Sequence, residues 1–311
     1  MDVLCVGIAV ADALGKPVDV IPEKARLALF DTLELHTGGC AVNTAIALSK
    51  IGVRTGVVAR VGDDAFGQFI ISELERYSVD TRGIRKDKKH STSFTFIMIS
   101  SDGERRFLHT FGANAHFCLE DIDLGLLKET RVVHVAGSYL MPAFDGPQTA
   151  EFLKKAKSAG VTTCMDTAFN DRVKDWFSIV KPCLPYLDLF LPSIEEAEKM
   201  SGKTEPADIA KFFVDNGAKT VGIKLGGKGS FVYQNGVGET VPIYKVKVVD
   251  TSGAGDSFVA GFLAGYLEGW DIVKCARFGN AVAAHCIQAI GCTAGVPDRK
   301  TVLKFQKDYK G

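Results

Sequence analysis

Residues 248–269, VVDTSGAGDSFVAGFLAGYLEG, combine a turn of small residues with a single carboxylate. The turn is SGAG at 252–255, and Asp256 stands where a helical pattern begins. A helix N-terminus exposes unpaired backbone N–H groups and carries a partial positive charge, so it binds anions. Small side chains let a phosphate reach the backbone itself. The stretch therefore predicts a phosphate site with an acid beside it.

Asp256 has two interpretations at this position. As a first-turn acid it can favour the helix dipole by roughly 0.3–1 kcal/mol. Beside an anion site it can instead act as a general base, which takes a proton from a substrate hydroxyl while the N–H groups hold a transferring phosphoryl group. The residues alone leave both interpretations open.

A second glycine-containing stretch, LHTGGCAVNTAIALSKIG at 35–52, has the residue types of a polyol site. Gly38 and Gly39 precede a helical pattern, and Asn43 falls in its first turn. Glycine lets a ligand touch the backbone, and an amide can both donate to and accept from a hydroxyl. Asp12, just beyond the first predicted strand, can accept two hydroxyl hydrogen bonds. A plain loop with capping residues is the alternative.

Two common nucleotide motifs are absent. VGIKLGGKGSF at 221–231 approaches a P-loop, but Gly229 stands where serine or threonine is required, and a strand-like run follows where a helix is needed. The dinucleotide-binding glycine fingerprint also fails, because neither Gly7 nor the region of Gly253 continues as GxGxxG after a strand.

The composition is that of an ordinary globular chain, with 37 basic and 37 acidic side chains among 311 residues. A net charge of zero argues against nucleic acid as the main ligand. No apolar stretch reaches about 18 residues, and the N-terminus has no basic region, so neither a membrane span nor a signal peptide is expected. The eight scattered cysteines predict reduced core residues of a cytoplasmic protein.

Strand-like and helix-like runs alternate along most of the chain. This rhythm predicts an α/β fold with a mostly parallel sheet covered on both faces. The predicted strands include 3–9, 55–62, 131–137, 161–166, 188–192, 219–226 and 245–250.

One region breaks the rhythm. Residues 91–111 predict a hairpin around a turn at 101–104, and residues 13–37 are extended and poor in helix. Together they predict a small separate sheet, with two ordinary edge strands as the alternative. Arg105 and Arg106 follow the turn and are interpreted as solvated hairpin residues. FTFIMIS would be an exposed apolar strand unless covered, which makes a homodimer through this sheet plausible.

Taken together, these residues resemble the ribokinase (PfkB) family of carbohydrate kinases. The two signatures are GGCAVN at 38–43, followed by Gly52 and Gly62, and DTSGAGD at 250–256. The resemblance implies one domain over 1–311, an α/β three-layer sandwich with a mostly parallel central sheet. It also implies a small β-sheet lid at about 13–37 and 85–114.

The resemblance further implies transfer of the γ-phosphate of ATP to a hydroxymethyl group of a sugar, with Mg²⁺ and K⁺ as ions. Asp256 would be the base, and the N–H groups of Gly253, Ala254 and Gly255 would form the anion hole. The sugar would be bound by Asp12, Gly38, Gly39, Asn43 and Asn114, and the nucleotide by Ser193, Lys224, Gly226, Gly229 and Asn280. Glu196 would help place Mg²⁺, and Asp250, Ser252, Ala289 and Gly291 would hold K⁺.

Two positions depart from the family pattern. Ser193 stands where the magnesium-placing motif has asparagine, and Cys40 stands where strict ribokinases carry lysine. An unphosphorylated pentose, ketohexose or sugar acid is therefore expected as substrate. A nucleoside kinase is the alternative, since Phe94, Phe96, Phe107 and Phe111 could line a wider pocket. A non-catalytic sugar sensor has only Ser193 in its favour.

Overall fold

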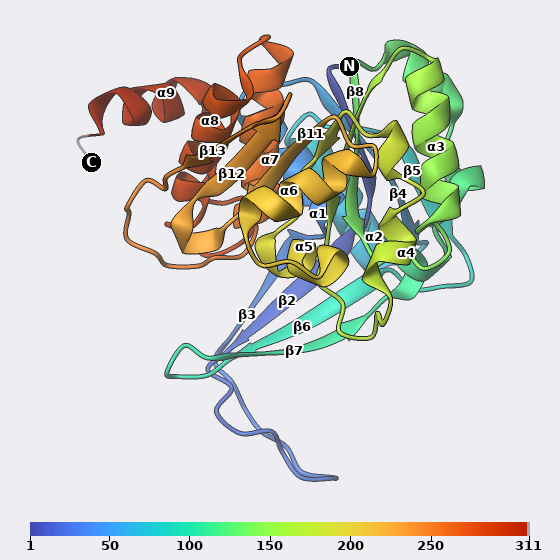
Figure 1. Ribbon diagram of the computed structural model, residues 1–311. Coiled ribbons are helices and arrows are strands. Elements are labelled where there is room, and N and C mark those ends of the chain that lie inside the picture. Colours follow the sequence, from blue (N-terminus) through green and yellow to red (C-terminus); the bar gives the residue numbers. More distant parts are fainter. Residues whose placement is uncertain (310–311) are drawn as a thin grey trace.

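The protein contains a large sheet and a small one that projects from it (Figure 1). A computed structural model describes residues 1–309. The large sheet has nine strands in the order β13-β12-β11-β10-β9-β8-β1-β4-β5. Its strands are parallel from β11 to β5, and β12 and β13 are antiparallel. The mostly parallel sheet expected from the sequence is confirmed.

The strands of both sheets have the following bounds: β1 (Val3–Gly7), β2 (Val10–Lys16), β3 (Thr32–Gly38), β4 (Thr55–Gly62), β5 (Asp80–Asp87), β6 (Ser93–Ile99), β7 (Arg105–Thr110), β8 (Val132–Ser138), β9 (Thr162–Thr167), β10 (Leu189–Phe190), β11 (Thr220–Lys224), β12 (Ser230–Gln234) and β13 (Val237–Val241).

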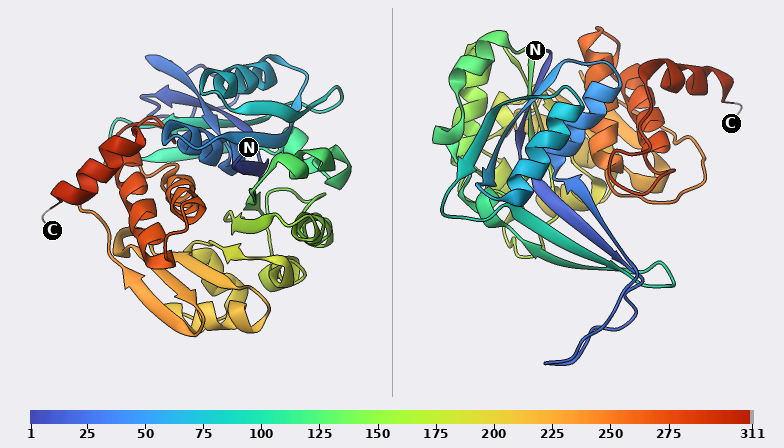
Figure 2. Two further views of the ribbon diagram at one scale, coloured as in Figure 1. Left: turned by 90° about the horizontal axis from the view of Figure 1, so that it is seen from above. Right: turned by 180° about the vertical axis from the view of Figure 1, so that it is seen from behind.

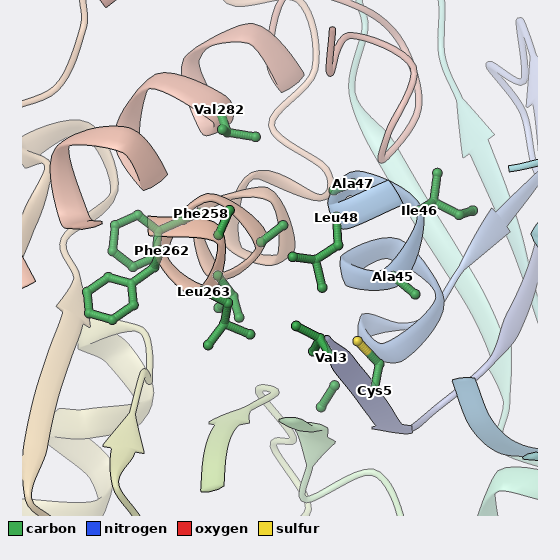
Figure 3. Packing of buried hydrophobic residues seen from close by; sticks show 14 of the residues in the cluster. Val3, Cys5, Ala45, Ile46, Ala47, Leu48, Phe258, Phe262, Leu263 and Val282 are labelled. Carbon is green, nitrogen blue, oxygen red and sulfur yellow. The ribbon is translucent and has the colours of Figure 1, made fainter. Parts of the chain in front are cut away.

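Helices cover both faces of the large sheet, which makes three layers (Figure 2). Side chains alternate across a strand, and β1 shows the result: Val3 and Cys5 pack with α1, α7 and α8, while Leu4 and Val6 pack with α3, α5 and α6. The first of these two cores is seen in Figure 3. The α-helices are α1 (Cys40–Lys50), α2 (Ala65–Arg76), α3 (Pro147–Ser158), α4 (Trp176–Val180), α5 (Ile194–Ser201), α6 (Pro206–Asp215), α7 (Ala254–Leu267), α8 (Ile272–Cys286) and α9 (Arg299–Asp308).

The small sheet, here called the lid, has the order β3-β2-β6-β7. Strand β2 is antiparallel to β3 and parallel to β6, and β6 forms the predicted hairpin with β7. The sequence placed the start of the second lid segment at about 85, but β5 of the large sheet continues to Asp87. The apolar run FTFIMIS lies mainly in β6, which is paired on both sides, so the expectation of an unpaired strand was wrong.

The segment before α7 also differs from its prediction. Residues 245–250 alternate like a strand, yet they are irregular and pair with no sheet. Strand β13 is the edge of the large sheet and ends just before Pro242, which has no N–H to donate. Val248 and Val249 are 56% and 46% exposed, so the alternation does not mark a buried face.

Two further expectations concern the helices and the cysteines. No helix within residues 1–309 is long and apolar enough to cross a membrane. The eight cysteines are all free thiols, and five of them are buried.

Candidate active site

The N-terminus of α7 lies at the carboxyl edge of the large sheet. Gly253 precedes the helix with φ 72°, a left-handed conformation that favours glycine. A Cβ at Gly253 would lie 2.1 Å from the carbonyl oxygen of Cys292, so the loop after α8 also excludes a side chain. Within residues 1–309, no acceptor takes a hydrogen bond from the N–H groups of Gly253 and Gly255. These two donors are available to an anion, whereas the N–H of Ala254, the third donor expected from the sequence, donates to the Thr251 carbonyl oxygen at 3.3 Å.

Helix α7 is held in place by α8. A Cβ on Gly261 would lie 2.8 Å from the Cα of Gly279, so the two helix backbones approach closely at this point. The contact fixes the position of the helix whose N-terminus forms the anion site.

Asp256 and Asn43 bring the two sequence motifs together. Asn43 Nδ2 donates to Asp256 Oδ2 at 2.8 Å, across a separation of 213 residues. Asn43 is only 4% exposed, and its Oδ1 is buried without a partner among residues 1–309. A buried carbonyl oxygen without a donor is costly. It is a suitable acceptor for a substrate hydroxyl beside the carboxylate.

The carboxyl of Asp256 is poised to exchange a proton near neutral pH. Burial and the neighbouring charge of Asp166 raise its pKa to about 6, although Asn43 and Lys224 both favour the charged form. A general base works best when its pKa lies near the operating pH. The structure therefore gives Asp256 an electrostatic setting that a simple helix-capping acid does not need.

Lys224, the last residue of β11, supplies positive charge beside the anion site. Its Nζ lies 3.6 Å from Asp166 Oδ2, and a Cβ on Gly255 would lie 3.5 Å from the same nitrogen. Burial alone would lower the pKa of Lys224, but Asp166, Glu196 and Asp256 together raise it. The ammonium therefore stays charged and can bind a phosphate. These groups surround a hollow of about 370 Å³ lined by Cys40, Asp166, Ser193, Glu196, Lys224, Gly253, Ala254, Gly255 and Asp256, among others.

A larger cleft of about 690 Å³ continues from this hollow. Lys224, Gly226, Ala254 and Gly255 line both. The Nδ2 of Asn280 is used within the protein, because it donates to the carbonyl oxygens of Val241 and Pro242 and so holds the cleft wall. The sequence missed the irregular segment 243–248, which forms much of that wall, because its alternation resembled a strand. The predicted nucleotide residues in the lining are Lys224, Gly226, Gly229 and Asn280, whereas Ser193 lines only the smaller hollow.

Asp12 lies on the lid, in a row of polar side chains. The strand register places it opposite His36 on one side and Thr95 on the other, and Thr95 opposite His109. Burial raises the pKa of Asp12 to about 6, while Thr95 and His36 oppose that shift. Sequence reasoning missed His36, Thr95 and His109. Their shared face follows from register, which is decided only when the strands pair.

Gly38, Gly39 and Asn114, which the sequence also predicted to bind the sugar, determine the course of the backbone around this row. A Cβ on Gly38 would lie 2.0 Å from Asp12 Oδ2, and one on Gly39 would lie 2.5 Å from the carbonyl oxygen of Ile8. The Asn114 amide is already used, because its Oδ1 accepts from the N–H of Ala9 and its Nδ2 donates to the Ala9 carbonyl. Asn114 thus holds the connection from β1 to the lid.

Comparison with known proteins identifies the family. Residues 1–299 match the pfkB family of carbohydrate kinases. The chain belongs to this family. It is 29% identical over 290 residues to a 5-dehydro-2-deoxygluconokinase of Clostridium perfringens, covering 88% of this chain and 85% of the relative. It is 30% identical over 287 residues to an ATP-dependent 6-phosphofructokinase of Thermoanaerobacterium thermosaccharolyticum, covering 90% and 87%. A structure of Arabidopsis thaliana ribokinase with ribose and ATP matches with a TM-score of 0.87 and 28% identity over 98% of each chain.

This pfkB kinase has residues that fit a magnesium ion at the smaller hollow. Thr167 Oγ1 and the Ser193 N–H both donate to Glu196 Oε2, at 2.7 and 3.0 Å, which leaves Oε1 without a protein donor among residues 1–309. Within residues 1–309, no group of three or more His, Cys, Asp or Glu side chains is arranged to hold a metal ion. Mg²⁺ commonly binds through one or two carboxylates, waters and substrate phosphates, so Glu196 suits it. Ser193 contributes through its backbone N–H, which is independent of its departure from asparagine.

The residues predicted to hold potassium do not fit that ion in this kinase. Arg105 Nη1 and the Ser252 N–H donate to Asp250 Oδ1, at 2.8 and 2.9 Å, and the Gly291 N–H donates to Oδ2 at 2.9 Å. Burial would raise the pKa of Asp250, but these donors outweigh it and lower the pKa to about 2. The only carboxylate of the predicted potassium site is therefore already paired. Two unit positive charges about 4 Å apart near a protein surface repel by about 4 kcal/mol.

The interpretation of Arg105 as a solvated hairpin residue was wrong. Its side chain is 24% exposed and that of Asp250 only 1%. Arg106, the next residue on β7, is exposed as expected. A local pattern of charge after a turn could not reveal a partner 145 residues away.

Proposed function

We propose that this pfkB kinase transfers the γ-phosphate of ATP to a hydroxymethyl group of an unphosphorylated sugar. The observation that carries the proposal is the pairing of Asn43 Nδ2 with Asp256 Oδ2, because it leaves a buried acceptor on Asn43 next to a carboxylate with a raised pKa. Both groups lie beside the free N–H groups at the start of α7. A hydroxyl placed here meets a base, an acceptor and an anion site at once.

The mechanism follows from these positions. ATP occupies the 690 Å³ cleft, and its terminal phosphate reaches the hollow where Lys224 and the N–H groups of Gly253 and Gly255 lie. Asn43 orients the sugar hydroxyl, and Asp256 accepts its proton as the oxygen attacks the γ-phosphorus. The bond between that phosphorus and the β–γ bridging oxygen breaks, and ADP leaves with the electron pair. The N–H groups and Lys224 stabilise the charge on the transferring phosphoryl group. Mg²⁺, when bound near Glu196, would neutralise phosphate charge.

The lid supports a sugar or sugar acid as acceptor. Asp12 and its neighbours in the polar row can bind hydroxyl groups, and a further hollow of about 770 Å³ contains Arg172, which could bind a carboxylate. The name of the Clostridium perfringens relative, 5-dehydro-2-deoxygluconokinase, is in line with a keto sugar. A phosphosugar is less well supported, because Arg105 is engaged with Asp250 rather than with a sugar pocket.

A nucleoside is the second candidate acceptor. Phe107, Phe111 and Phe169 line the 770 Å³ hollow and could stack on a base. Phe94 and Phe96 do not contribute, because they alternate with Thr95 on β6 and instead pack with tilted rings against Phe66 and Phe30, respectively. The aromatic wall expected from the sequence is thus only partly supported.

A substrate screen tests both candidates. Pentoses, ketohexoses, sugar acids, a hexose phosphate and nucleosides are supplied with ATP and Mg²⁺, and ADP release is measured for the natural chain and for Asp256→Asn. We expect turnover with at least one unphosphorylated sugar or sugar acid and its loss in the variant. Turnover of nucleosides alone would select the second candidate. No turnover at all, with sugar binding retained, would support a sensor instead.

We also propose that the protein is cytoplasmic and forms a homodimer through the lid. Eight free thiols are in line with a reducing compartment. The segment 17–31 between β2 and β3 projects beyond the lid (Figure 1), and Leu27 and Leu29 on it are 83% and 86% exposed. Exposed leucines of this kind favour a protein contact. Light scattering on the natural chain and on Leu29→Asp measures the mass, and a monomer in both would refute the dimer.

A further inference from the structure

The contact between Arg105 and Asp250 joins the lid to the large body. Arg105 is the first residue of β7, and Asp250 lies in the irregular segment that leads into α7. The same Nη1 atom donates to Asp250 Oδ1 at 2.8 Å and to Ser252 Oγ at 3.0 Å. Ser252 is adjacent to Gly253, whose N–H belongs to the anion site. A side chain of the lid therefore touches the residue next to the phosphate-binding donors.

Asp250 ties together the two loops that shape the anion site. Its Oδ1 accepts from the Ser252 N–H before α7, and its Oδ2 accepts from the Gly291 N–H after α8. The same loops meet again where Gly253 faces the carbonyl of Cys292, and where Cys286 Sγ donates to the carbonyl oxygens of Ser252 and Cys292. The conformation of Gly253 thus depends on the charge of Asp250 staying in place.

A carboxylate as buried as Asp250 requires a counter-charge. In this chain the guanidinium of Arg105 provides it, and backbone N–H groups satisfy the remaining lone pairs. A bound monovalent cation would have to displace the arginine or lie against it. The positive charge beside Asp250 therefore comes from Arg105, a residue of the lid.

We propose that Arg105 is a built-in cation that replaces a bound monovalent ion in ordering the anion site of α7. Two consequences follow: the activity does not require potassium, and the anion site is complete only while the lid lies against the body. Arg105 is a positioning residue, since it acts through Asp250 and Ser252 and not on the reacting atoms. The kinetic part of this inference rests on the proposed kinase function.

The kinetic test exchanges potassium for choline at constant ionic strength. The enzymes are the natural chain, Arg105→Ala, Arg105→Lys and, as matched control, Arg106→Ala, which removes the exposed neighbour on the same strand. For the natural chain and the control, kcat should change by less than about twofold, because screening is held constant. Arg105→Ala should lose about 10–100-fold in choline, as partners of a site-forming group commonly do, and should regain activity saturably with potassium. Arg105→Lys should keep most of the activity in choline.

The thermal test does not depend on turnover. The melting temperature of each protein is measured by calorimetry in potassium chloride and in choline chloride. Potassium should raise the melting temperature of Arg105→Ala by roughly 2 °C or more, because it binds to the folded state, and should leave the melting temperature of the natural chain unchanged. This readout decides the question even if the substrate screen finds no acceptor, so failure of the proposed function is distinguishable from failure of the inference.

Three results would overturn the inference. The first is potassium activation, or potassium-specific thermal stabilisation, of the natural chain. The second is an Arg105→Ala variant that matches Arg106→Ala in choline. The third is loss of activity in Arg105→Ala that neither potassium nor the lysine variant restores, because the arginine would then act by hydrogen-bond geometry and not as a cation. If Arg105→Ala does not fold, the natural chain still gives the first result, and an Arg105→Lys variant that folds but loses its activity in choline would overturn the inference in place of the third.

Discussion

Asp256 and Asp12 have carboxyl groups with the same pKa of about 6, yet they stand in different parts of the molecule. Asp256 begins a helix in the three-layer body, where α7 is locked against α8. Asp12 lies on the lid, whose outer strands expose Leu33 and Leu108 at 62% and 63%. Burial is the largest cause of the raised pKa in both places, and Asp166 adds to it for Asp256, so proton affinity alone does not distinguish a base from a binding group.

The surroundings of the two acids separate their roles. Asp256 has an amide, an ammonium and a second carboxylate around it, all held by the ends of α1, β11 and β9. Asp12 has Thr95 and His36, both from the lid. In the proposed function, the chemistry that needs fixed geometry takes place in the body, and the sugar is recognised on the lid. The following experiments separate the two acids.

Replacing Asp256 by asparagine should have the largest effect. Loss of a general base costs about 10²–10⁴ in kcat, while KM for the sugar should change little, because Asn43 and the lid remain. The melting temperature should stay the same or rise, since a buried charge is removed. Steady-state kinetics and calorimetry measure both. A variant with normal kcat would contradict the role of Asp256 as base.

Replacing Gly253 by alanine should have the next largest effect. The new Cβ would meet the Cys292 carbonyl and displace the anion-site donors, which typically costs about 10²–10³ in kcat. Gly269→Ala is the control, because Gly269 has φ 73° and open space around its Cβ position. It carries the same backbone strain without the collision. Equal kcat values for the two variants would place the anion site elsewhere.

Replacing Asp12 by asparagine should mainly weaken sugar binding. Hydrogen bonds to a charged group contribute about 1.5–3 kcal/mol, so KM should rise by roughly 10–100-fold while kcat changes less. Glu104→Gln, an exposed acid next to the lid strand β7, is the control and should keep a nearly normal KM. If the kcat of Asp12→Asn fell as far as that of Asp256→Asn, the division between body and lid would fail.

A change of pH near neutrality should alter the activity less than any of the three substitutions. A base must be deprotonated, and the free carboxyl of Asp256 has a pKa of about 6, so kcat/KM should fall as the pH drops below that value. Because Asp12 also has a pKa of about 6 and affects KM, the diagnostic limb is that of kcat at saturating sugar, which should disappear from the residual activity of Asp256→Asn and persist in Asp12→Asn. Initial rates between pH 5 and about pH 8 measure it. Persistence of the limb in Asp256→Asn would assign it to another group.

The sequence predicted most of the fold and the centre of the site. Alternating strands and helices gave the parallel sheet, and two helix N-termini with glycines gave the anion and polyol residues that the structure brings together. Local pattern failed where a partner decides the outcome. Residues 245–250 alternate but have no strand to pair with, and Arg105 finds its carboxylate only after the lid folds over the body. Register likewise placed His36 and Thr95 beside Asp12, and His109 beside Thr95.

The close approach of α7 and α8 has a consequence for engineering. Replacing helix glycines by alanine is a common way to make a protein more heat-resistant. At Gly261 the added methyl group would press on Gly279, and the helix would have to slide or tilt to make room. The far end of that same helix carries the phosphate-binding donors. A change about two turns away would therefore disturb these donors and, through overpacking, lower thermal tolerance as well, so a search for sturdier variants should leave this pair of glycines untouched.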